Sequence, residues 1–236
     1  MNHQALFHEI AGFCEANRNP ELVEKYSRYF KEGYDAYGLQ KGLLEAKIQE
    51  IIEREQAKLS DYLPLCELLI PESKYELPSA AIWFFIKLKQ QYTRDSFLAI
   101  ESWFDSGINN WAHCDAVCME LIKLHLRKKI ISMEDLAHWR LSSRPFKRRA
   151  SLVSMIYAMN DAYPADSVLA FTDPLMQDKE RVVQQGAGWL LRETWKKHPS
   201  LTEAFLFRWK NTAPRLIIQY ATEKMSKEEK QRFRKD

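Results

Sequence analysis

Apolar residues recur at helical spacing along the whole chain, and no stretch alternates as a half-buried β-strand would. The pair Asn19-Pro20 marks one helix start, because Asn is a favoured N-cap residue and Pro is favoured at the first helical position. Asn110 marks another start, directly before Trp111. After an N-terminal helix, the pattern predicts helices over residues 20–30, 39–52, 60–71, 80–90, 93–104, 111–126, 132–141, 145–159, 165–176, 179–198, 202–210 and 214–224.

Short turns marked by Pro, Ser and Asn separate these helices, and helix pairs recur with a period of roughly 35–45 residues, as in helical repeat proteins. The sequence therefore predicts an all-α fold, a HEAT-like α-solenoid of about six antiparallel helix pairs with a concave basic face. A compact helical bundle is the structural alternative. We expect one domain over residues 1–236, without an internal linker, in which the charged tail 225–236 frays.

Composition agrees with a globular helical protein. Hydrophobic residues make up 46% of the chain, whereas its 7 glycines are few for a turn-rich β fold or a phosphate loop. The four cysteines form no C-x-x-C motif and resemble the reduced thiols of a cytosolic protein. The N-terminus lacks the pattern of a signal peptide, and the strongest apolar stretch, residues 80–86, is far too short to span a membrane. We therefore expect a cytoplasmic location.

The net charge of +3 hides an uneven distribution. Residues 1–120 carry 12 Lys and Arg against 19 Asp and Glu, a net charge of −7, whereas residues 121–236 carry 23 against 13, a net charge of +10. Such asymmetry favours contact between the C-terminal half and a polyanion. A neutral domain with unevenly placed surface lysines is the alternative interpretation.

Trp111 and Asp115 are four residues apart and share a face of the predicted helix. An aromatic wall beside a carboxylate attracts cations through the π face of the ring. The alternative is structural, with a packed ring and a surface carboxylate, and the spacing alone favours it.

Arg144, Lys147, Arg148 and Arg149 lie at and just after a predicted helix start, where the helix dipole disfavours cations. A phosphate is a natural partner for such a group, because the side chains and the helix N-terminus attract the same anion. A solvated basic turn is the alternative.

Two glycines, Gly186 and Gly188, interrupt a predicted helix directly before Trp189. Each costs about 1 kcal/mol relative to Ala in a helix interior, so the helix must gain something there. Close helix packing and close approach of a ligand both account for them. Arg192 and Lys196 extend one side of this helix in either case.

Metal and nucleotide motifs are not found in the sequence. Cys114 and Cys118 lie four apart beside His113, but a zinc site needs more ligands at suitable spacing, and we interpret them as core thiols. The remaining histidines are scattered, and no P-loop, Rossmann fingerprint or nucleophile elbow is present.

In four segments, the chain resembles the AlkD family of bacterial DNA alkylation repair glycosylases, in order and with similar spacing. These segments are residues 21–30 followed by Tyr37-Gly38-Leu39, residues 111–115, residues 146–150 and residues 188–193. The chain departs from the family pattern at two places, both of which concern expected contacts with DNA. Ala112 stands where the family often has an acidic residue, and Gln40-Lys41-Gly42-Leu43 replaces a turn that usually carries Pro and Arg.

The resemblance implies a glycosylase that excises positively charged alkylated purines, N3-methyladenine and N7-methylguanine, by hydrolysing the N-glycosidic bond. By position, it implies catalytic roles for Asp115, Trp111, Trp189 and Arg149. It implies DNA contacts for Tyr29, Lys147, Arg148, Arg192 and Lys196.

The expected partner is double-stranded DNA that contains alkylated bases, bound by a monomer at the bacterial nucleoid, without a metal, organic cofactor or obligate protein partner. The alternative is a non-catalytic HEAT-like module that binds DNA or acts as a protein scaffold.

Overall fold

The computed structural model describes residues 1–31, 33–159 and 163–235. Within these residues the regular secondary structure is helical, apart from an isolated bridge between Met159 and Tyr163. The prediction of an all-α protein is therefore confirmed. Packing divides the chain into two compact units, Met1–Leu121 and Ile122–Asp236. The concave basic face and the single domain stay predictions.

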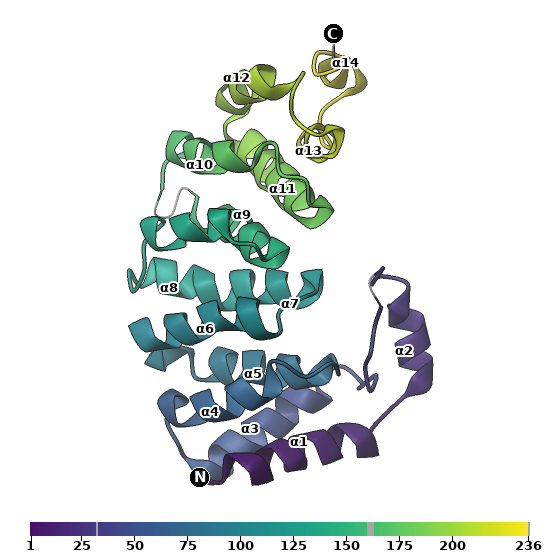
Figure 1. Cartoon of the computed structure of the whole chain (residues 1–236), viewed down its shortest axis with the longest axis vertical. Helices are drawn as coiled ribbons and strands as arrows, with labels where there is room; N and C mark the ends of the chain where they lie inside the picture. The colour runs from purple at the N-terminus through teal and green to yellow at the C-terminus, as the bar shows by residue number, and fades with distance from the viewer. Residues whose placement is uncertain (32, 160–162, 236) are drawn as a thin grey trace. The chain divides into compact units, whose positions relative to one another are not determined.

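Unit 1 is a stack of helices (Figure 1). Helix α2 and the segment after it, residues 28–42, lie beside the other helices. Its core is formed by fully buried side chains of the stacked helices, including Ile10, Ile48, Leu65, Phe84 and Trp103. Its helices are α1 (His3–Ala16), α2 (Pro20–Ser27), α3 (Leu43–Glu55), α4 (Leu59–Leu69), α5 (Glu76–Lys87), η1 (Lys89–Gln91), α6 (Arg94–Ser106) and α7 (Trp111–Ala116).

Both predicted Asn caps are present. The Asn19 side chain accepts hydrogen bonds from the backbone N–H groups of Glu21 and Leu22, at 3.0 and 3.3 Å, and Pro20 is the first residue of α2. The Asn110 side chain accepts from the His113 N–H at 2.9 Å and so fixes the start of α7.

The start of α5 differs from the prediction, which placed it at residue 80. The helix begins at Glu76, because Pro78 lies in the first turn, where its missing N–H costs nothing. Ser79 is thus inside the helix, and its hydroxyl donates back to the Tyr75 carbonyl at 2.8 Å.

The buried carboxylate of Glu76 holds the segment after α2 against α5. It accepts hydrogen bonds from the backbone N–H groups of Tyr37 at 2.9 Å, Gly38 at 2.7 Å and Leu39 at 3.3 Å. Gly38 has φ +81°, and a Cβ there would lie 2.3 Å from the Asn19 carbonyl oxygen. Because only glycine combines this conformation with this close approach, Gly38 sets the path of the segment.

The helix predicted over residues 111–126 changes register in its middle. α7 is followed by a π-helical turn, η2 (Val117–Ile122), and then by α8 (Lys123–Arg127). The boundary between the two units falls inside this turn. Such π-turns are frequent at functional sites, and this one begins two residues after Asp115.

Unit 2 is organised around α11, which packs against α9 and α13. Its core includes Trp139, Leu152, Val153, Leu190 and Ile217, all essentially inaccessible to solvent. After α8, its helices are η3 (Glu134–Leu141), α9 (Pro145–Ala158), α10 (Ala165–Thr172), η4 (Asp173–Leu175), α11 (Arg181–Lys197), α12 (Pro199–Trp209), α13 (Arg215–Ala221) and α14 (Lys227–Gln231).

The charged tail contains the short helix α14. Ser226 and Glu229 form a reciprocal capping box at its start. Phe233 is fully buried and stacks on Phe207, with ring centroids 4.6 Å apart. The expectation that the tail frays stays a prediction, and Asp236 lies outside the described residues.

Over the described parts of the chain, no helix has both the length and the apolar character that crossing a membrane would require.

Replacing Gly188 by Ala should destabilise the protein by about 1–3 kcal/mol, because the new Cβ would lie 2.4 Å from the Tyr220 Cβ and 2.9 Å from the Ile217 carbonyl oxygen. Gly12→Ala is the matched control. It lies inside α1 with no atom within 4 Å of the added methyl, so it should stabilise by about 0.5–1 kcal/mol. Urea denaturation of both variants measures the difference, and equal effects would contradict the packing argument.

Candidate functional site

Trp111 begins α7 and is 41% exposed, yet its ring is fixed in place. The indole Nε1–H donates to the Tyr29 carbonyl oxygen at 3.1 Å. The Phe30 ring stacks on the indole, with centroids 5.6 Å apart and planes 24° from parallel. Both contacts come from the segment after α2, which therefore holds the Trp111 ring on one side.

Asp115 lies one turn further along α7 and is half-buried. Residues four apart on an α-helix are neighbours on one face, with Cβ atoms about 5–6 Å apart. Unit 1 thus presents an exposed indole and a carboxylate side by side, as the spacing predicts.

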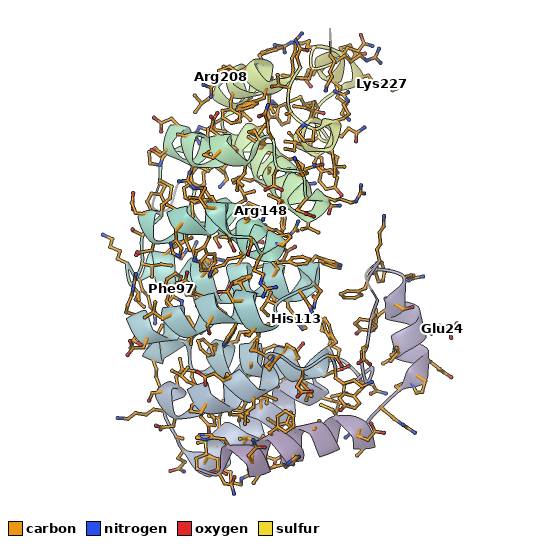
Figure 2. The ribbon with its side chains drawn as sticks, viewed as in Figure 1. Glu24, Phe97, His113, Arg148, Arg208 and Lys227 are labelled. Atoms are coloured by element: carbon orange, nitrogen blue, oxygen red, sulfur yellow. The ribbon has the colours of Figure 1, made fainter. Side chains whose placement is uncertain are left out.

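His113, on the same helix and labelled in Figure 2, connects α7 to α5. The Asn110 amide nitrogen lies 2.7 Å from Nδ1, and because an amide nitrogen can only donate, the ring proton lies on Nε2. Nε2 lies 2.8 Å from the Ser79 hydroxyl and 3.1 Å from the Tyr75 carbonyl oxygen. Burial lowers the pKa of His113 to about 4, so the ring is neutral at physiological pH.

The sequence assigned no role to His113. It stacks on Tyr75 with ring centroids 4.3 Å apart, and so connects α7 to the residue before α5. The signal that could have found it is its position three residues after the Asn110 cap, where its side chain can reach the cap residue.

Beside Trp111, unit 1 contains a cavity of about 580 Å³, here called the aromatic cavity. It is lined by rings from α2, the segment after α2, α5 and α7, and by the carboxylates of Glu45 and Glu76. The principal rings are Tyr26, Phe30, Tyr34, Tyr75, Trp83 and Trp111. Nothing in the sequence predicted this cavity, because its walls come from positions that are far apart in the chain.

Arg149 and Trp189, the other two predicted catalytic residues, belong to unit 2. Arg149 is only 6% exposed, and its Nη1 donates to the Val182 carbonyl oxygen on α11 at 2.8 Å. A Cβ at Gly186 would lie 3.2 Å from the Arg149 Cγ. Gly186 therefore gives the arginine room to lie along α11.

The two glycines of α11 are both explained by close packing. Gly188 is in contact with α13, and Gly186 is in contact with α9 through Arg149. Of the two interpretations that the sequence left open, helix packing is the one for which the structure supplies contacts. Trp189, on the same helix, is half-buried.

The predicted DNA-contacting cations of α9 have partners within unit 2. The Arg148 guanidinium binds the Asp178 carboxylate with two hydrogen bonds of 2.7 and 3.2 Å and donates to the Ser142 carbonyl oxygen at 2.7 Å (Figure 2 labels Arg148). Lys147 is 8% exposed, and its Nζ lies 5.8 Å from the centroid of the Trp139 ring. A protein carboxylate thus neutralises Arg148, where the sequence favoured a phosphate.

Arg192 and Lys196 also take part in ion pairs. The Arg192 Nη1 lies 2.5 Å from Glu223 Oε2, and its Nε lies 3.1 Å from Glu193 Oε1. The Lys196 Nζ lies 2.8 Å from Glu193 Oε2. A phosphate would have to compete with these carboxylates. Their role in DNA contact, like that of Tyr29, stays a prediction.

In the part of the chain that the structure describes, no group of three or more His, Cys, Asp or Glu side chains is placed to hold a metal ion. The four cysteines are buried thiols that form no disulfide.

A family model described as DNA alkylation repair enzyme matches residues 14–225, which is most of the chain. The protein belongs to the DNA alkylation repair enzyme family. No curated protein matches it significantly.

The chain is also similar in fold to solved structures. A predicted DNA alkylation repair enzyme from Enterococcus faecalis superposes with a TM-score of 0.73 at 16% identity, over 89% of this chain and 98% of the other. AlkD2 from Streptococcus mutans gives 0.60 at 17% identity, over 88% and 99%. The protein smu.31 from Streptococcus mutans UA159 gives 0.60 at 18% identity, over 87% and 98%. At these identities, the likeness shows a shared fold.

In this member of the DNA alkylation repair enzyme family, two predicted catalytic residues, Trp111 and Asp115, lie together in unit 1. The other two, Arg149 and Trp189, lie on neighbouring helices of unit 2. The convergence of all four on one cleft stays a prediction.

His113 should make the stability of this repair-family protein sensitive to acid. The unfolded imidazole titrates near 6.5 and the folded one near 4, so between these values only the unfolded chain binds the proton. Lowering the pH from 7 to 5 should therefore cost the wild type ~2 kcal/mol more than His113→Gln.

Urea denaturation at the two pH values measures this difference. His8→Gln, on the exposed face of α1, is the control and should behave as the wild type does. The same pH dependence in the wild type and His113→Gln would show that the buried imidazole does not titrate as described.

Proposed function

We propose that this protein is a DNA glycosylase that excises positively charged alkylated purines, N3-methyladenine and N7-methylguanine, from double-stranded DNA. The observation that carries the proposal is the pair on α7. An exposed indole, held by the Tyr29 carbonyl and the Phe30 ring, lies one helical turn from a half-buried carboxylate. Membership in the DNA alkylation repair enzyme family supports the same chemistry.

The chemistry follows from the charge of the substrate. Alkylation at N3 or N7 gives the purine a positive charge, which weakens the N-glycosidic bond and makes the base a good leaving group. Departure of the base leaves a sugar with oxocarbenium character. Asp115 stabilises this cation electrostatically and orients or deprotonates the attacking water, which completes hydrolysis.

The remaining predicted site residues position the nucleotide. The π faces of Trp111 and Trp189 attract the cationic base and sugar. Arg149 holds a backbone phosphate, with Tyr29, Lys147, Arg148, Arg192 and Lys196 as further contacts along the DNA. We propose that the protein acts as a monomer on DNA in the bacterial cytoplasm.

Asp115→Asn should slow the release of N7-methylguanine from methylated duplex DNA by about 10²–10³-fold, because the amide removes the charge that stabilises the oxocarbenium ion. Single-turnover assays separate this step from product release. The affinity for DNA should not fall, since no favourable phosphate contact is lost.

Asp105→Asn removes an exposed carboxylate from α6 and is the matched control, with an expected rate equal to that of the wild type. Release at the wild-type rate by Asp115→Asn would refute the role of this carboxylate. A wild-type protein that binds methylated DNA but releases no base would be the non-catalytic DNA-binding module.

Arg149→Ala should weaken binding to alkylated and to unmodified DNA by the same factor. It should also reduce the slope of log affinity against log salt concentration by about 0.9, because one phosphate contact is lost. Fluorescence anisotropy over a range of salt concentrations measures both quantities.

Lys197→Ala, which removes an exposed cation from the end of α11, is the control. Because Arg149 also donates to the Val182 carbonyl, thermal melting must show that Arg149→Ala is folded. An unchanged salt slope in a folded variant would remove Arg149 from the phosphate contacts.

A further inference from the structure

The segment that follows α13 packs onto unit 2 through buried side chains on both sides of α14. Met225, before this helix, is 4% exposed, and Phe233, after it, is inaccessible to solvent. The Phe233 carbonyl oxygen accepts a hydrogen bond of 2.9 Å from Arg215 Nη1, at the start of α13. The side chains between Met225 and Phe233 are exposed or half-buried. The charged side chains of this segment therefore lie on the surface of unit 2.

This surface carries an excess of positive charge. Residues 224–236 contain six Lys and Arg against three Asp and Glu, a net charge of +3. One of the six cations, Arg232, is used within the unit, where it pairs with Glu203 at 3.0 Å and lies over the Phe207 ring. The exposed cations that form no ion pair with any described residue are Lys227 (labelled in Figure 2), Arg234 and Lys235.

Glu223 joins this surface to the cationic side of α11. Its Oε2 lies 2.5 Å from Arg192 Nη1, and its Oε1 lies 3.1 Å from Lys224 Nζ. Its carbonyl oxygen accepts a hydrogen bond of 3.0 Å from Lys230 Nζ. Hydrogen bonds from Lys224 and Arg192 lower the pKa of Glu223 below its usual range, so the carboxylate is charged at neutral pH. One carboxylate surrounded by three cations leaves the positive charge in excess, and the basic side of α11 continues onto the tail.

The chemistry of this surface favours DNA over a membrane. A membrane surface is usually bound by exposed apolar side chains that accompany the cations. Here the two large apolar side chains of the segment, Met225 and Phe233, are buried. Phosphates of a duplex attract cations whatever the base sequence, and unit 2 as a whole has a net charge of +10. Cations without accompanying apolar groups on a basic unit match the backbone of double-stranded DNA.

We propose that the C-terminal segment of unit 2 binds phosphates of double-stranded DNA and extends the contacts expected of Arg192 and Lys196. The inference rests on the proposed function only in taking DNA as the polyanion. Phosphate contacts carry no sequence information, so this surface increases the affinity for alkylated and unmodified duplexes alike. Glu223 limits that affinity, because it neutralises cations that would otherwise face phosphates. The phosphate-binding cations, here called the tail surface, are Lys224, Lys227, Arg234 and Lys235.

Fluorescence anisotropy of the full chain with unmodified duplex DNA, over a range of salt concentrations, tests the tail surface. The tail variant replaces Lys227, Arg234 and Lys235 together by Gln. Its affinity should fall by about tenfold or more at low salt. The slope of log affinity against log salt concentration should decrease by about 2–3, because each lost phosphate contact removes about 0.9.

A second triple variant, Lys58→Gln with Lys129→Gln and Lys197→Gln, is the matched control. It removes the same net charge from exposed cations that are scattered over both units. Its salt slope should stay within one contact of the wild type. Thermal melting checks that both triple variants are folded. An unchanged slope in the tail variant, or an equal loss in the control, would overturn the proposal.

Glu223→Gln tests the same surface through a gain of affinity, which loss of folding cannot produce. It should tighten binding to unmodified duplex DNA by about 2- to 5-fold, because Arg192 and Lys224 become available to phosphates. Glu67→Gln removes an exposed carboxylate from α4 and is the control, with little expected change. No gain in Glu223→Gln, or an equal gain in Glu67→Gln, would refute the continuous surface between α11 and the tail.

A base-release assay on methylated duplex DNA distinguishes failure of this inference from failure of the proposed function. With protein in saturating excess, the tail variant should release N7-methylguanine at the wild-type rate, and only the protein concentration that gives half the maximal rate should rise. Normal binding by the tail variant together with normal base release would refute the tail surface and keep the glycosylase. Weakened binding by the tail variant, with no base release by the wild type, would keep the tail surface and refute the glycosylase.

Discussion

The contact between the Glu76 carboxylate and three consecutive backbone N–H groups is the constraint on which the rest of unit 1 depends. Backbone N–H groups that converge on one anion form a favourable site, and here the anion belongs to the protein itself. The contact fixes residues 37–39 to the start of α5. Tyr29 and Phe30, which belong to the same connection between α2 and α3, contact the Trp111 ring.

The two units differ in net charge, since unit 1 is acidic and unit 2 is basic. The acidic unit holds the carboxylate and the exposed indole, both of which suit a cation. The basic unit holds Arg149 and most of the positive charge, which suits a polyanion. Alkylated DNA combines both properties, since a cationic base is attached to an anionic backbone.

The sequence predicted the helices well, because apolar periodicity and Asn caps are local properties. It placed Trp111 and Asp115 on one helix for the same reason. It misplaced the start of α5, because the position of Pro78 within a first turn depends on where the helix begins. It did not indicate that Phe233 is buried, because the partner ring, Phe207, is remote in the chain.

The ion pairs of the basic residues also could not be predicted from local sequence patterns. Arg148 stands out in the sequence as a cation near a helix start, but Asp178, which neutralises it, lies 30 residues further along. The aromatic cavity is likewise assembled from separate helices, so no single motif indicates it. Local patterns therefore indicated which residues deserve a functional explanation. They did not indicate which residues these side chains contact, because that depends on the tertiary structure.

The anchor of Trp111 has a consequence for how this site changes during evolution. The acceptor for its indole N–H is the main-chain oxygen of residue 29, which every amino acid possesses. The side chain at that position can therefore be exchanged over time without releasing the ring, provided that the chain keeps its path. A contact of this kind depends on backbone geometry, so the amino acid at position 29 does not reveal it.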